Sequence, residues 1–308
     1  MPPQPHRPAE LAGQVFRGSD AIRRGLLTRH QLRGASWLRL RQDVYADARL
    51  DRDHHLACRA ALLRLPPGAL IAGPSAAHLH GVGDAARFDD EVHVLVSGSA
   101  RVDPQTGIRV HRFTPDLVGG RNGRSPARPP ADGVGESGPL RTGPAECAWE
   151  TAVWSDPFRA VAIVDALLGR GLVRRDELAE VADRRAGRSG GRRAGWIFGL
   201  ADPASGSSAE SHLRVGLVLA GLPRPVARHP VRLGPDLVLH PELAWPEFHV
   251  AIECGDRRRA VADHPGLARL ADAGWLVLSV ASRRLHREFP AVQAQVLAAL
   301  RARGWRRR

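Results

Sequence analysis

The sequence predicts an α/β protein in which a winged-helix-like α+β region precedes a C-terminal domain of αβββαβ order. Two observations lead to this prediction. Near the N-terminus, helix-like segments at residues 19–25 and 28–34 precede residues 37–45, where apolar and basic side chains alternate. Helix, turn, helix and ribbon is the order of a winged helix. From residue 208, helical spacing gives way to three strand-like runs, followed by a helix, a strand and a helix, as in an α/β domain.

Local signals support the elements of the N-terminal region. Thr28 is predicted as the N-cap of the second helix, and Gly25 and Gly34 suit helix ends. Helical spacing continues over residues 51–65, and Pro74 is expected at the start of another short helix. The region should end with two strands, which we expect at residues 91–96 and 108–113.

The middle of the chain, residues 119–200, is predicted to connect the N-terminal region to the C-terminal domain. Residues 119–143 are dense in Gly, Pro and Arg and predict an exposed loop. Helices are expected at residues 145–154, 158–168 and 175–185, before a second Gly/Arg-rich stretch at residues 187–195. We therefore divide the chain into a winged-helix-like region (1–118), a connecting region (119–200), an α/β domain (201–301) and a basic tail (302–308), which we expect in solvent.

The α/β domain follows from its own pattern of apolar residues. The expected elements, in order, are a helix at 208–219, strands at 226–233, 237–244 and 248–254, a helix, a strand at 275–280 and a helix at 290–301. At 308 residues, the chain is long enough for this domain and a second compact unit.

Composition narrows the classes of partner. The net charge of +13 favours a polyanion such as DNA, and all 45 basic residues are arginines because the sequence contains no lysine. No apolar run approaches the roughly 18 residues that a membrane span needs, so we expect no membrane partner. The three cysteines lie far apart, without zinc-site spacing, which favours a reduced, cytoplasmic protein.

Three carboxylates in the C-terminal domain have spacings that suggest a metal site: Glu210, Glu242 and Glu253. If Trp245-Pro246-Glu247 forms a tight turn, Glu242 lies opposite Ala251 on the next strand. Glu253, two residues further, points to the same face. Asp236 competes with Glu242 but would lie about 20 Å away along a straight strand. Converging carboxylates are the ligands that Mg²⁺ prefers for phosphodiester hydrolysis.

An ordered series of motifs carries a family resemblance. It comprises Ser-Ser-Ala-Glu-Ser (207–211), Ala-Gly-Leu-Pro-Arg-Pro (220–225), Glu-Leu-Ala-Trp-Pro (242–246), Val-Ala-Ile-Glu (250–253) and Ala-Gly-Trp-Leu-Val-Leu (273–278). This series resembles a domain related to very-short-patch-repair endonucleases, of the restriction-endonuclease-like PD-(D/E)xK superfamily. The resemblance implies that Glu210, Glu242 and Glu253 bind the catalytic Mg²⁺.

The N-terminal region resembles an AbiEi-type antitoxin region that contains a winged helix. The motifs that carry this likeness are residues 25–32, the Asp43-Val-Tyr45 turn and residues 75–81. Such a region implies that DNA and a toxin or defence-system protein are partners.

The chain departs from the endonuclease pattern in two ways. Glu242 stands where the family has Asp, and Gly255 stands where the wider fold has its lysine, so Arg257 or Arg258 is expected to supply the cation. Arginine binds phosphate well but does not act as a base. Two alternatives therefore stay open: a catalytically inactive DNA-binding regulator or toxin–antitoxin component, and a protein–protein interaction module of a defence system.

Basic residues of the N-terminal region form the predicted nucleic-acid surface. Those on the second helix are Arg29, His30 and Arg33, and those on the ribbon are Arg39 and Arg41. In a DNA-reading winged helix, these side chains would contact base edges and phosphates. The alternative is a solvated basic face on a small packing module.

Overall fold

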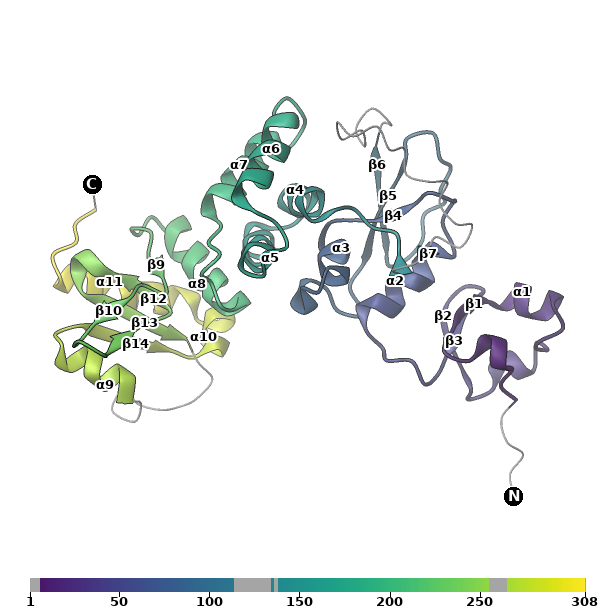
Figure 1. Ribbon diagram of the computed structural model, residues 1–308, viewed down its shortest axis with the longest axis horizontal. Coiled ribbons are helices and arrows are strands. Elements are labelled where there is room, and N and C mark those ends of the chain that lie inside the picture. The colour runs from purple at the N-terminus through teal and green to yellow at the C-terminus, as the bar shows by residue number, and fades with distance from the viewer. Residues whose placement is uncertain (1–5, 114–133, 136–137, 255–264, 308) are drawn as a thin grey trace, which may run out of the picture. The chain divides into compact units, whose positions relative to one another are not determined.

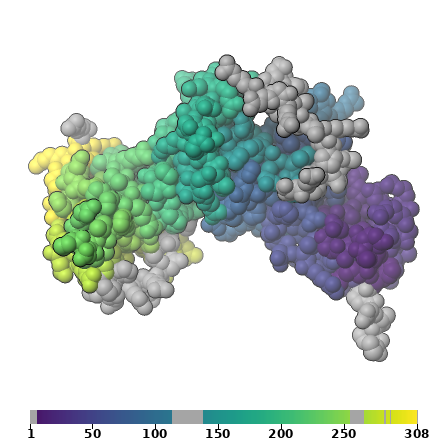
Figure 2. Space-filling view, viewed as in Figure 1, coloured from purple at the N-terminus to yellow at the C-terminus, as the bar shows by residue number. Residues whose placement is uncertain are grey.

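The computed structural model describes residues 6–113, 134–135, 138–254 and 265–307. The protein is mixed α/β, as the sequence predicts, and divides into two compact units, residues 1–150 and 151–308. In Figures 1 and 2, the first unit runs from purple to teal and the second from teal to yellow. The division therefore precedes the boundary that we place near residue 200. Each unit is described by itself below.

The first unit begins with a small antiparallel sheet of order β1-β3-β2. Its elements are β1 (Val15–Arg17), α1 (Gly18–Arg23), β2 (Trp37–Arg41) and β3 (Val44–Asp47). The predicted ribbon is present, since β2 and β3 pair as a hairpin. Asp43 in its turn has a φ of 59°, and its carboxylate accepts hydrogen bonds from the amide and hydroxyl of Ser19. The turn is thereby tied to the start of α1.

The prediction of a second α-helix in the winged helix, at residues 28–34, is wrong. Residues 28–34 contain only a three-residue 3₁₀ helix, Gln31–Arg33. The N-cap of this 3₁₀ helix is His30 rather than Thr28, although the Thr28 hydroxyl accepts the Gln31 amide and the Gln31 side chain accepts the Thr28 amide. Gly34 then takes up an extended conformation that leads into β2, so the segment ends after one turn.

The rest of the first unit is built around a second sheet, of order β4-β5-β6, in which β5 and β6 are parallel. The elements of this part of the unit are α2 (His54–Leu62), β4 (Leu70–Ile71), α3 (Gly73–Leu79), β5 (Val92–Ser97), β6 (Ile108–Phe113), β7 (Val134–Gly135) and β8 (Gly138–Pro139). Helix α4 (Pro144–Trp154) follows, and the division between the two units falls within it. The expected α2, α3, β5 and β6 are thus present, with Pro74 in the first turn of α3.

Helices that we expected to connect two domains belong to the second unit. They are α5 (Pro157–Gly169) and α6 (Arg175–Arg184), and they are followed by α7 (Gly191–Leu200), a helix that was not predicted from the sequence. Helix α5 packs against both α7 and α8 (Ser208–Leu219), which explains why the chain divides before α5. Part of the Gly/Arg-rich stretch at residues 187–195 forms the first turns of α7.

The second unit contains a four-stranded mixed sheet of order β14-β13-β12-β9 (Figure 1). Its remaining elements are β9 (Val226–Ala227), β10 (Val231–Arg232), β11 (Val238–Leu239), β12 (Leu243–Trp245), β13 (Val250–Cys254), α9 (Pro265–Asp272), β14 (Leu276–Val280), α10 (Ser282–Arg287) and α11 (Phe289–Ala302). Strand β13 is parallel to β14 and antiparallel to β12.

The sheet lies between two apolar layers. One face packs against α8 and α11, through buried residues such as Leu213, Ile252 and Val296. The other face packs against α9, with Ala251 beside Leu270. The C-terminal tail that we expected in solvent is also attached, since Trp305 packs against the first of these layers.

Close packing of α8 on α11 gives a first prediction. A Cβ at Gly216 would lie 2.3 Å from the Phe289 ring, so Gly216→Ala should lower the free energy of unfolding by about 1–3 kcal/mol. Urea denaturation would measure this change. Gly195→Ala is the matched control in α7, because its Cβ would meet no atom within 4 Å. The control should be neutral or more stable, since Ala is the better helix former. Equal stability of Gly216→Ala and wild type would contradict the packing.

Candidate active site

The three predicted acids come from three elements of the second unit. Glu210 lies in the first turn of α8, where the Ser207 hydroxyl caps the helix by accepting the Glu210 amide at 3.2 Å. Glu242 lies one residue before β12, and Glu253 lies near the end of β13. Glu210 is only 1% exposed, whereas Glu242 and Glu253 are partly buried.

The hairpin register differs from the one that we predicted. Ala244, not Glu242, pairs with Ala251, so Glu242 lies opposite Glu253. The connection is longer than a tight turn, because residues 246–248 form a 3₁₀ helix and His249 has a φ of 50°. The shift is two residues, and side chains alternate with a period of two. The two glutamates therefore share one face, although the predicted pairing is wrong.

Hydrogen bonds hold the two strand glutamates against each other. The Glu242 amide donates to Oε1 of Glu253 at 3.3 Å, and the Cys254 amide donates to Oε2 of Glu242. Each carboxylate is thus fixed by the neighbouring strand's backbone. The arrangement brings both acids to the same end of the β12–β13 pair.

The pKa values of the two strand glutamates are affected by the charges of the neighbouring carboxylates. Burial raises the pKa of Glu242 to about 7, and the charges of Glu210 and Glu253 add to this rise. Burial also raises the pKa of Glu253, where the charge of Glu210 adds to the rise and that of Arg228 opposes it. Carboxylates that repel one another in a partly buried site are characteristic of functional sites.

Arg228 is the residue that sequence reasoning missed. Its guanidinium donates to Oε1 of Glu210 at 2.9 Å, and the Gly206 amide donates to Oε2 of Glu210 at the same distance. Arg228 has a φ of 51° and separates β9 from β10, which we predicted as one strand, 226–233. Pro230 was the available signal of this break, since proline cannot donate to a strand ladder.

Asp236, the competing acid, does not pair with the strand glutamates in the structure. Asp236 is exposed between β10 and β11, away from the pair that Glu242 and Glu253 form. Arg257 and Arg258, the predicted source of the cation, lie outside the described residues. Among those that are described, no group of three or more His, Cys, Asp or Glu side chains is already arranged to hold a metal ion.

The predicted nucleic-acid residues of the first unit divide into two groups. The exposed residues are Arg29, His30, Arg33 and Arg39. Arg29 and Arg33 help to line a cavity of about 500 Å³ beside Tyr45. Arg41 is different. Its guanidinium donates to the carbonyls of Thr106 and Gly107, which occupies it within the unit.

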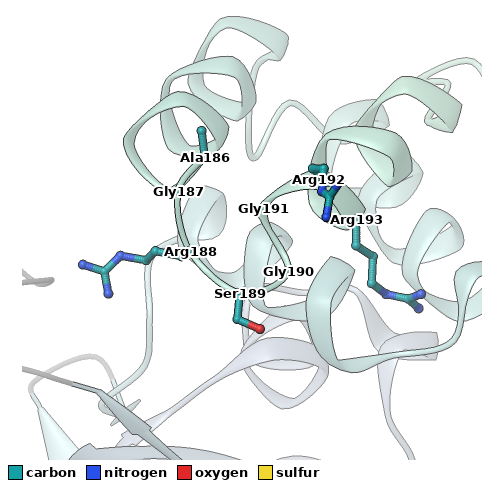
Figure 3. A pocket seen from close by; sticks show the side chains of 8 residues that line it. All are labelled: Ala186, Gly187, Arg188, Ser189, Gly190, Gly191, Arg192 and Arg193. Carbon is teal, nitrogen blue, oxygen red and sulfur yellow. The ribbon is translucent and has the colours of Figure 1, made fainter.

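A second cavity, of about 570 Å³, lies at residues 186–193, before and into α7 (Figure 3). Arg188 and Arg193 extend in opposite directions from this segment (Figure 3). The guanidinium of Arg193 donates to the Ala152 carbonyl at 3.0 Å, so it attaches the segment to the C-terminal end of α4. No carboxylate lines this cavity, which is therefore distinct from the acidic cluster.

No helix in the described part of the chain has the length and apolar character needed to cross a membrane. No model of a known protein family matches the sequence. The chain is similar to two uncharacterized proteins, one from each of two strains of Mycobacterium tuberculosis. Each is 28% identical over 211 residues, which cover 65% of this chain and 72% of the relative. The names of these two relatives state no function.

Proposed function

We propose that this chain is a DNA-associated phosphodiesterase whose second unit hydrolyses phosphodiester bonds with a divalent metal ion. One observation carries the proposal. Glu242 lies opposite Glu253 on adjacent strands, within the electrostatic reach of the buried Glu210. The order of helix, strands and acids is also that of the restriction-endonuclease-like fold, which the motifs resemble. The net charge of +13 favours a nucleic acid as substrate.

The chemistry of the cluster suits a hard divalent cation such as Mg²⁺, which prefers carboxylate oxygens. Glu210, Glu242 and Glu253 would hold it, after side-chain rearrangement that turns their oxygens toward one point. Bound there, Mg²⁺ supplies an activated water and neutralises charge on the phosphoryl group. Arg228 is 42% exposed, so its remaining N–H groups would bind a phosphate oxygen beside the cluster.

Cleavage of supercoiled plasmid DNA in Mg²⁺ or Mn²⁺ tests this function. Glu253→Gln should lower the rate at least ~100-fold, because one carboxylate ligand is lost while the side-chain volume is kept. Glu247→Gln is the matched control, since Glu247 is exposed on the 3₁₀ helix of the same hairpin. Wild-type cleavage that Glu253→Gln leaves unchanged would exclude the cluster as the active site. If the DNA stays intact with every metal ion tested, hydrolysis of DNA is excluded. The same assay with an RNA substrate would then test hydrolysis of RNA.

A second function keeps the fold without the chemistry, as a DNA-binding regulator or toxin–antitoxin component. The pairing of Arg228 with Glu210 favours it, because a guanidinium already neutralises the most buried acid. Protein that leaves DNA intact yet shifts a promoter fragment at about 100 mM salt would support this function. If the protein neither cleaves nor binds DNA, the remaining hypothesis is a protein–protein interaction module of a defence system.

A further inference from the structure

We propose that Arg228 is the built-in counter-cation of the acidic cluster and sets how tightly Glu210, Glu242 and Glu253 hold a divalent cation. This inference rests on the proposed function and concerns the same site. It differs from that function because it concerns metal affinity, which can be measured without any nucleic acid.

The contact with Glu210 is direct and well placed. Nη2 of Arg228 lies 2.9 Å from Oε1 of Glu210, whose side chain is 2% exposed. The other oxygen of Glu210 accepts the Gly206 amide. Both oxygens of this acid are therefore engaged, one of them by a positive charge. A divalent ion that binds Glu210 has to share Oε1 with the guanidinium or displace it.

The backbone around Arg228 is built to keep the side chain there. Arg228 adopts a left-handed conformation, which is uncommon for a residue other than glycine. Its amide donates to the Glu242 carbonyl at 3.1 Å, which fixes it beside the strand that carries the second acid. Backbone strain of this kind persists where the surrounding structure determines it, often at functional sites.

Gly206 provides the space for the guanidinium. A Cβ on this glycine would lie 2.6 Å from Nη2 of Arg228 and 3.1 Å from Oε1 of Glu210. Any larger residue at this position would push the arginine off the acid. The ion pair thus depends on the side chain and the left-handed backbone of Arg228 and on the absence of a Cβ at Gly206.

The charges define the expected effect. Arg228 places one positive charge among three carboxylates, at the position where a metal ion would meet Glu210. Like charges a few ångströms apart in a partly buried site repel strongly, because the effective dielectric constant there is about 20. Removing the guanidinium charge should therefore tighten the binding of a divalent ion at least ~tenfold.

Calorimetric titration of the full chain with MnCl₂, without nucleic acid, tests the inference. Arg228→Gln should bind Mn²⁺ at least ~tenfold more tightly than wild type, and Arg228→Lys, which keeps the charge, should stay near wild type. Arg232→Gln is the matched control, because Arg232 is an exposed arginine on the next strand. The double variant Arg228→Gln/Glu253→Gln should lose the gain, which assigns the ion to this cluster.

Gly206→Ala is the second variant, in case loss of Arg228 prevents folding. It keeps the charge but displaces the guanidinium from Glu210, so Mn²⁺ affinity should rise in the same direction. Unchanged or weaker Mn²⁺ binding in both variants would overturn the inference, whatever the protein does to DNA. Tighter binding in these variants, together with intact plasmid in the cleavage assay, would uphold the inference and reject hydrolysis.

Discussion

Replacing Asp165 by Ala is expected to lower the free energy of unfolding of the second unit by about 3–5 kcal/mol. Asp165 on α5 and Arg214 on α8 form an ion pair in which the two residues are 1% and 0% exposed. Arg214 also donates to the Leu200 carbonyl, and Asp165 accepts the Ser211 hydroxyl. Without Asp165, a guanidinium charge stays buried without its counter-ion.

The cost comes from the orphaned charge rather than from the strength of the pair. Burial raises the pKa of Asp165 although Arg214 and Ser211 oppose the rise, as expected where taking both charges out of water is costly. The double variant Asp165→Leu/Arg214→Met should therefore recover much of the loss. Chemical denaturation followed by circular dichroism would measure both variants.

Asp176→Ala removes an exposed partner of Arg174 and serves as the control. It should change stability little, because water screens an exposed pair. A loss for Asp165→Ala no greater than that of this control would contradict the account of the buried pair.

Glu242→Gln is expected to stabilise the protein at pH 8 by up to about 3 kcal/mol and to change it little at pH 5. The folded protein holds the pKa of Glu242 at about 7, above the ordinary value of 4.5. The proton is therefore bound more tightly in the folded state. The resulting stabilisation is fully present below about pH 4.5 and is lost as the pH rises through 7. Glutamine cannot ionise, so the variant escapes this loss.

Urea denaturation at the two pH values, in EDTA to exclude metal ions, would test this expectation. Glu247→Gln is the control, because it removes an exposed carboxylate from the same hairpin and should show no comparable dependence on pH. A gain for Glu242→Gln that is equal at pH 5 and pH 8 would show that ionisation is not its cause. A confirmed result would mean that the acidic cluster is kept at the expense of stability.

The shared face of Glu242 and Glu253 could be predicted from the sequence because a register error of two residues does not change which face a strand side chain points to. The predicted turn is shorter than the observed connection, which includes the 3₁₀ helix at residues 246–248. The prediction therefore paired Glu242 with Ala251, whereas the structure places it opposite Glu253. An error of two residues leaves every side chain on its predicted face. Apolar periodicity also predicted α8, β13, β14 and α11, because it is set locally, but it merged β9 with β10 and did not predict α10.

Features set by contacts between distant residues could not be predicted in this way. Arg228 reaches Glu210 because one residue takes a left-handed conformation, and no periodicity encodes that. The pairing of Asp165 with Arg214 spans 49 residues, and nothing local indicates which of many arginines is the partner. The helix expected at residues 28–34 failed because extended backbone at Gly34, leading into β2, leaves room for one turn.

The packing of α5 on α8 determines which shortened versions of this protein can be purified. A fragment that begins at residue 201 keeps the sheet and all three acids, but it leaves Arg214 without Asp165 and uncovers the side of α8 that α5 covers. Such a fragment is expected to aggregate or to be degraded by proteases. A fragment that begins at residue 151 retains the packing of α5 on α8 and is therefore the fragment expected to survive limited digestion.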